Sequence, residues 1–242
     1  MRSPAGGSLT WLRRRAPATL GLLAVTVAVF AAQEASILTR GLDLALTWGM
    51  KDRGGLQAGQ LWRLVTPIFI HAGVIHLAVN MYSLYVIGPA VERFFGRARL
   101  LTVYLLSGVS GVVLSLALNP GPSVGASGAI FGLLGALTAF LYTHRKLFGP
   151  AAQAQLRQIG FVLALNLILS LTPGIDAWGH LGGLIAGAAC GWLLGPRFAA
   201  VPSEDGATHV VDQRRWGDVR GRAAGAAVVL LAVAALVILL VR

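Results

Sequence analysis

Seven long apolar runs, separated by short polar blocks, constrain this 242-residue chain more than any other feature. Hydrophobic residues make up 56% of it and charged residues only 12%, whereas a soluble domain carries roughly 25% charged residues. A run of about 17–25 apolar residues is long enough to cross a bilayer as a helix. The runs lie at residues 17–33, 68–90, 100–118, 126–143, 157–172, 177–195 and 223–241. The sequence therefore predicts an all-α membrane protein, a helical bundle that crosses the bilayer seven times.

The distribution of lysine and arginine predicts how this bundle is oriented. If the N-terminus is inside, 15 of the 20 lysine and arginine residues fall in inside segments. Cytoplasmic loops of membrane proteins carry such an excess, so we expect the N-terminus inside and the C-terminus outside. The net charge of +11 then reflects topology, and no interleaving of aromatic and basic residues indicates binding to nucleic acid.

Composition along the chain predicts four segments. These are a cytoplasmic N-terminal segment at 1–16, a six-helix core at 17–196, a cytoplasmic polar linker at 197–222 and an additional C-terminal transmembrane helix at 223–242. Within the core, the loop at 34–67 is long, half-apolar and contains Trp48 and Trp62. We expect this loop to lie in the membrane interface rather than free in water.

Polar side chains gather at one end of three apolar runs. The second run carries His71, His76 and Asn80. The fourth begins near Ser127, and the sixth carries His180 close to its start. Under the predicted topology all three runs enter from the outside, so these residues lie on one side of the membrane. Polar residues at membrane depth are costly and are commonly functional. His76 and Asn80 share a helix face because they are four residues apart, and His71 is expected nearer the surface.

The spacing of small residues predicts which helices touch. In the sixth run glycine recurs every four residues, at Gly179, Gly183, Gly187, Gly191 and Gly195. The fourth run has small residues at the same period, at Gly128, Gly132 and Ala136. Such stripes let membrane helices approach closely. Because Ser127 and His180 each adjoin a stripe, packing would bring them toward hydrogen-bond distance. A serine next to a basic side chain is the arrangement of an activated nucleophile.

The position of Ser127 at the start of a predicted helix also favours nucleophilic chemistry. Unpaired backbone N–H groups and the positive end of the helix dipole stabilise a developing anion there. Gly125 and Gly128 let the backbone approach a substrate closely. Asp176, four residues before His180, is interpreted as a solvated loop carboxylate, and a role as third member of a triad is the alternative. Asn166, in the fifth run, is expected to form a hydrogen bond between helices.

Other functions are weighed against the same residues. A transporter or channel also places polar residues in a bundle, but no aspartate or glutamate lies within any predicted span. The single cysteine, Cys190, lies in an apolar run, and no Cys/His spacing indicates a metal site. We therefore expect no metal and no cofactor.

The polar motifs resemble those of the rhomboid family of intramembrane serine proteases. The resemblance rests on Gly125-Ala126-Ser127-Gly128, on Gly179-His180-Leu181-Gly182-Gly183 and on His71-x4-His76-x3-Asn80, and it covers about residues 60–195. It implies six core helices, to which this chain adds one at the C-terminus. It also implies that Ser127 is the nucleophile and His180 the general base, a dyad without a carboxylate. His76, Asn80 and the Ser127 N–H would hold the oxyanion.

Further residues acquire roles from this resemblance. Phe131 occupies a position where an aromatic ring, often tyrosine, stacks on the histidine, and Gly179 stands where alanine is usual. His71, Gly125, Gly128 and Gly183 are expected to support the site.

The resemblance further implies the setting in which the protein acts. The substrates would be single-span membrane proteins, cut in or near the lipid bilayer at small residues. The fifth run and the loop at 172–174 would form a gate for the substrate helix. We expect a multi-pass protein of a bacterial plasma membrane with its site near the extracytoplasmic side, and the oligomeric state is not predicted. The alternative within the family is an inactive relative that binds membrane clients, although this chain keeps both Ser127 and His180.

Overall fold

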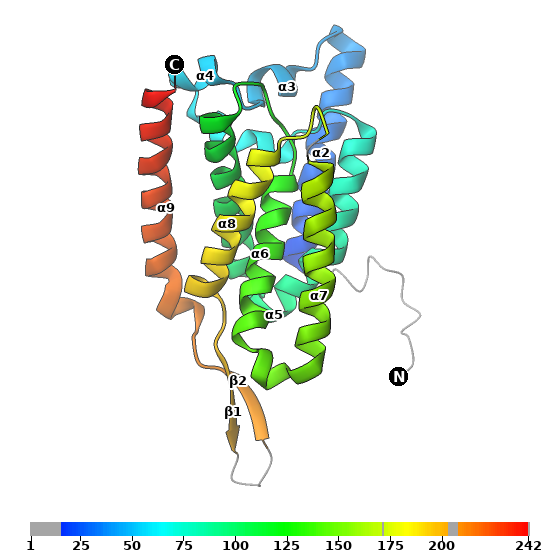
Figure 1. Ribbon diagram of the computed structural model, residues 1–242. Helices are drawn as coiled ribbons and strands as arrows, with labels where there is room; N and C mark the ends of the chain where they lie inside the picture. The colour runs from blue at the N-terminus through cyan, green and yellow to red at the C-terminus, as the bar shows by residue number, and fades with distance from the viewer. Residues whose placement is uncertain (1–15, 171, 203–207, 242) are drawn as a thin grey trace.

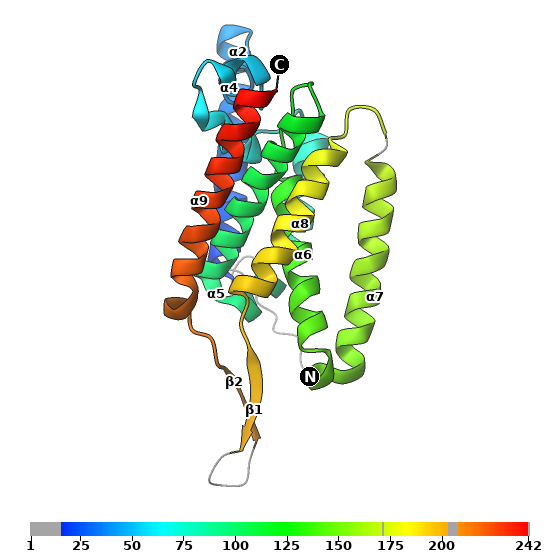
Figure 2. The ribbon, with the colours of Figure 1, turned by 60° about the vertical axis from the view of Figure 1, so that its left-hand side comes forward.

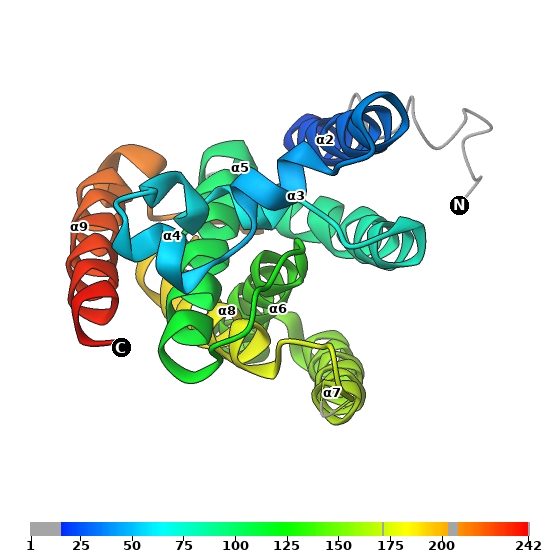
Figure 3. The same ribbon diagram turned by 90° about the horizontal axis from the view of Figure 1, so that it is seen from above.

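The computed structural model describes residues 16–170, 172–202 and 208–241, and these form a bundle of helices (Figure 1). Most of the predicted N-terminal segment at 1–16 lies outside the described residues. The long helices are α2 (Pro17–Arg40), α5 (Val74–Leu118), α6 (Ser127–Thr143), α7 (Arg145–Leu169), α8 (Ala177–Leu194) and α9 (Trp216–Leu240). Between α2 and α5, the shorter helices are α3 (Leu44–Gly49), α4 (Arg53–Gln57), η1 (Leu61–Leu64) and η2 (Thr66–Phe69). Seen along the bundle in Figure 3, α3 and α4 lie across its end.

Each predicted apolar run lies largely within one of the long helices. Among the described residues, four helices are long and apolar enough to cross a membrane, namely α2, α5, α8 and α9, and α6 is a shorter apolar helix. The 45-residue α5 holds most of the predicted run 68–90 and all of the run 100–118, and Gly96 (φ 76°, ψ 167°) interrupts its helical geometry between the two. The prediction of an all-α multi-pass membrane fold is confirmed, and the number of seven spans stays a prediction.

The two stripes of small residues pack against each other, as their spacing predicts. A Cβ atom placed on Gly183 of α8 would lie 1.9 Å from the carbonyl oxygen of Gly128 on α6. One turn further, a Cβ on Gly187 would lie 2.0 Å from the Gly132 carbonyl oxygen. The backbones of α6 and α8 therefore touch directly. This contact fixes the positions of the first turns of both helices, which carry Ser127 and His180.

The remaining long helices surround this central pair. The α5 helix packs against both α6 and α8 and supplies buried residues such as Leu84, Val103 and Tyr104. In contrast, α7 stands at the edge of the bundle (Figure 2), and only Ala152 and Ile159 among its described residues are buried.

The segment predicted as a polar linker contains a β-hairpin. Strands β1 (Phe198–Pro202) and β2 (Thr208–Asp212) pair antiparallel, with Phe198 opposite Asp212. Arg99 of α5 holds the hairpin through an ion pair of 2.9 Å to Asp212. The last helix begins at Trp216, before the expected start at residue 223.

Candidate active site

Ser127 and His180 meet at one end of the bundle. Ser127 is the first residue of α6, and His180 lies in the first turn of α8. The distance between Ser127 Oγ and His180 Nε2 is 2.8 Å, which is within hydrogen-bond distance. The ring of Phe131, one turn along α6, stacks on the imidazole with 4.4 Å between centroids and 9° between planes. The direct contact of the α6 and α8 backbones thus brings a hydroxyl and an imidazole within hydrogen-bond distance, a geometry that an activated serine requires.

His76 lies beside the serine on the α5 side of the site. A Cβ atom added to Gly125 would lie 2.8 Å from His76 Nε2 and 3.8 Å from Ser127 Oγ. Gly125 has φ 126°, a backbone conformation that residues with a side chain rarely adopt. Both this backbone conformation and the lack of room for a Cβ atom require glycine here. Asn80 lies one turn along α5 from His76, is 5% exposed, and donates from its amide to the His76 carbonyl oxygen at 2.9 Å.

His71 precedes α5 and is buried inside the bundle, with only 1% of its surface exposed. Its depth relative to the membrane surface stays a prediction. Gln33 on α2 holds this loop against the bundle, because its side-chain amide accepts a hydrogen bond from the N–H of His71 and donates one to the His71 carbonyl oxygen. His71 Nε2 in turn accepts a hydrogen bond of 3.4 Å from the N–H of Ala126. His71 therefore supports the turn that precedes Ser127.

Asp176 does not contact the histidine ring in this structure. It is the N-cap residue of α8 and accepts from the Gly179 N–H at 3.1 Å. Its other carboxylate oxygen accepts from the Ser115 hydroxyl. Burial acts to raise the pKa of Asp176, but hydrogen bonds from two serines and the nearby Lys51 ammonium hold this pKa below its usual value. The interpretation as a solvated loop carboxylate is therefore wrong, because Asp176 joins the start of α8 to α5.

The other ring nitrogen of His180 contacts a residue that the sequence did not single out. Ser170, the C-cap residue of α7, has its Oγ 2.7 Å from His180 Nδ1. Serines often bond their own helix backbone, so nothing in the local sequence distinguishes this one. The prediction that Asn166 forms a hydrogen bond between helices is also wrong. Its side-chain amide donates to the carbonyl oxygen of Val162 in the same helix, at 2.8 Å.

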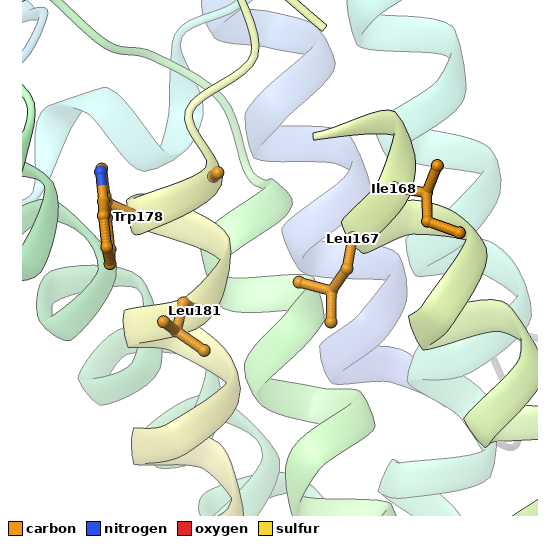
Figure 4. Close-up of a pocket in the computed structure, with 5 residues that line it drawn as sticks. Leu167, Ile168, Trp178 and Leu181 are labelled. Atoms are coloured by element: carbon orange, nitrogen blue, oxygen red, sulfur yellow. The ribbon is translucent and has the colours of Figure 1, made fainter. Parts of the chain in front are cut away.

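An apolar cavity of about 410 Å³ adjoins the site between α7 and α8. It is lined by Leu167, Ile168, Ala177, Trp178 and Leu181. In Figure 4, Leu167 of α7 points toward α8, where Trp178 and Leu181 lie. The two helices are therefore not closely packed at the height of the serine and histidine.

Fold and site together define a class: a multi-pass helical membrane protein with a hydrogen-bonded serine and histidine at one end of its bundle. Residues 58–197 match the family described as Rhomboid domain. This chain belongs to the rhomboid family, as the sequence motifs indicate.

Known relatives support the same assignment. The chain is 38% identical over 178 residues to the Rhomboid protease GluP of Bacillus subtilis (strain 168), covering 72% of this chain and 34% of the relative. It is 40% identical over 140 residues to RHOMBOID-like protein 6, mitochondrial, of Arabidopsis thaliana, covering 57% of this chain and 45% of that protein. This chain thus spans about a third to a half of the length of these relatives. One of these relatives is named as a protease and the other as a rhomboid-like protein.

Proposed function

We propose that this protein is an intramembrane serine endopeptidase that uses Ser127 and His180 as a catalytic dyad. The observation that supports this most is the 2.8 Å contact between Ser127 Oγ and His180 Nε2. In the proposed reaction Ser127 Oγ attacks the scissile carbonyl carbon while His180 Nε2 takes the hydroxyl proton. The imidazolium then gives this proton to the leaving amine as the C–N bond breaks. Water hydrolyses the acyl-enzyme, again with His180 as base.

Three groups near Ser127 are proposed to bind the oxyanion. The backbone N–H of Ser127 is at the start of α6, where helical N–H groups have no partner within the helix. The His76 ring lies beside Gly125, and the Asn80 amide lies one turn away from His76. Donors positioned in advance stabilise the charge that develops on the carbonyl oxygen in the transition state.

Asn80→Ala is expected to lower kcat for a transmembrane reporter by about 10²–10³-fold with little change in KM, the usual effect of losing one oxyanion donor. Asn166→Ala is the matched control, because Asn166 makes the same amide bond to its own helix on α7. Steady-state cleavage in detergent measures both variants. Equal losses in the two variants, or no loss in Asn80→Ala, would contradict the role of Asn80.

The substrates are proposed to be single-span membrane proteins that reach the site from within the bilayer. This proposal rests on the rhomboid family and on a site that lies at the end of a membrane bundle. The excess of lysine and arginine in the predicted inside segments supports placing the site on the extracytoplasmic side. A bacterial plasma membrane is the proposed location.

A fluorophosphonate probe tests whether Ser127 is an activated nucleophile. We expect the purified, folded protein to be labelled at Ser127, and labelling to disappear in Ser127→Ala and in His180→Ala. The probe requires no knowledge of the natural substrate. A folded protein that neither reacts with the probe nor cleaves any transmembrane reporter would instead be a binding protein for membrane clients.

A further inference from the structure

Ser170 makes two hydrogen bonds through a single hydroxyl group. Its Oγ lies 2.7 Å from the carbonyl oxygen of Asn166 and 2.7 Å from Nδ1 of His180. The side chain is 4% exposed, so bulk water does not compete freely for either contact. Ser170 ends α7, whereas His180 belongs to α8.

Counting protons settles the direction of both bonds. A serine hydroxyl has one hydrogen and two lone pairs, and a carbonyl oxygen can only accept. The Ser170 hydrogen is therefore donated to Asn166, and toward His180 the Ser170 oxygen can only accept. It follows that Nδ1 of His180 carries a hydrogen.

The position of this proton fixes the state of the other ring nitrogen. A neutral imidazole has one protonated nitrogen and one acceptor. With the proton on Nδ1, the lone pair of Nε2 faces Ser127 Oγ at 2.8 Å. This is the tautomer that a general base for Ser127 needs.

We infer that Ser170 is a positioning residue that holds His180 in the tautomer with its proton on Nδ1. The inference rests on the proposed function of His180 as the base. A serine hydroxyl thereby takes the place that a carboxylate has in a Ser-His-Asp triad. Asp176, the nearby carboxylate, is occupied by Ser115 and by the N–H of Gly179. When His180 receives the Ser127 proton, the Nδ1–H bond to Ser170 becomes charge-assisted and stronger.

The same contact relates the edge helix α7 to the base. Among the hydrogen bonds of the described residues, the one between Ser170 and His180 is the side-chain link from the end of α7 to α8. The apolar cavity of about 410 Å³ separates the two helices beside it (Figure 4). On the α7 side, therefore, no close side-chain packing orients the His180 imidazole. The hydrogen bond to the Ser170 hydroxyl orients it instead.

Ser83 on α5 is a matched control for this residue. Its hydroxyl donates to the Val79 carbonyl oxygen at 2.8 Å. This hydrogen bond within the helix is of the same kind as the one from Ser170 to the Asn166 carbonyl oxygen. Ser83 is half-buried and makes no hydrogen bond to a ring among the described residues. Ser83→Ala therefore removes a hydroxyl that is bonded only to its own helix, and it can be compared with Ser170→Ala.

The test compares Ser170→Ala, Ser170→Thr and Ser83→Ala in the purified full-length chain. Cleavage of a single-span reporter with small residues at its outer boundary gives kcat and KM. ¹⁵N NMR of histidine-labelled protein reports which nitrogen of His180 carries the proton. We expect kcat to fall about 10- to 100-fold in Ser170→Ala, the range for a lost hydrogen bond to a charged group, with KM unchanged. In that variant the ring should show a mixture of tautomers, whereas Ser170→Thr and Ser83→Ala should resemble the wild type.

Two results would overturn the inference. One is a wild-type kcat in Ser170→Ala with an unchanged Nδ1–H tautomer, and the other is an equal loss in Ser83→Ala. An inactive wild-type protein would contradict the proposed protease function instead. In that case the NMR comparison still tests Ser170, because it does not depend on turnover.

Discussion

Ser127→Ala is expected to lower cleavage of a transmembrane reporter by at least about 10⁴-fold, because the variant has no hydroxyl to form the acyl-enzyme. His180→Ala should cause a loss of similar size, since the Ser127 hydroxyl is a weak nucleophile without a base at 2.8 Å. KM and the thermal midpoint of unfolding should stay close to the wild-type values. Gel-based kinetics and thermal denaturation in detergent measure these quantities.

The double variant is the control for this prediction. Residues that act as a unit in catalysis show strongly non-additive losses. Ser127→Ala combined with His180→Ala should therefore be no worse than either single change. Additive losses would show that the two residues act separately, contrary to the hydrogen-bonded dyad.

Gly183→Ala is expected to damage both stability and activity. The added methyl group would lie 1.9 Å from the Gly128 carbonyl oxygen, and because this atom belongs to the backbone of α6, no side-chain rotation can relieve the clash. Overpacking of this kind costs about 1–3 kcal/mol or more. The two helices must separate, which also moves His180 away from Ser127. The thermal midpoint of unfolding and the rate of reporter cleavage should therefore both decrease.

Gly160→Ala on α7 provides the comparison. Nothing lies within 4 Å of a Cβ atom at Gly160, and the residue is inside a helix. Replacing such a glycine with alanine gains roughly 0.5–1 kcal/mol. We expect Gly160→Ala to be at least as stable as the wild type and fully active. A Gly183→Ala variant as stable as Gly160→Ala would contradict the close backbone contact of α6 and α8.

Features with a regular period could be read from the sequence. The apolar runs predicted the helices because a membrane span requires many consecutive apolar residues. The four-residue spacing of Gly183 and Gly187 predicted the pairing of α6 and α8, because only small residues permit such an approach. The meeting of Ser127 and His180 follows directly from that pairing.

Features that depend on a single distant partner could not be predicted. The burial of His71 requires Gln33, which is 38 positions away on α2. The role of Asp176 depends on Ser115 of α5. Ser170 resembles any serine at the end of a membrane helix until the position of His180 is known. The β-hairpin was missed because charged residues around it suggested an irregular linker.

The product masses of a cleavage reaction test the central claim most directly. Purified protein in detergent would be incubated with a single-span reporter, and the fragments identified by mass spectrometry. We predict two fragments from one cut within or near the transmembrane segment, with masses that sum to the reporter plus one water, and no fragments with Ser127→Ala. Fragments that persist in Ser127→Ala, or a folded wild-type protein that leaves the reporter intact, would contradict the assignment of Ser127 as the nucleophile of an intramembrane protease.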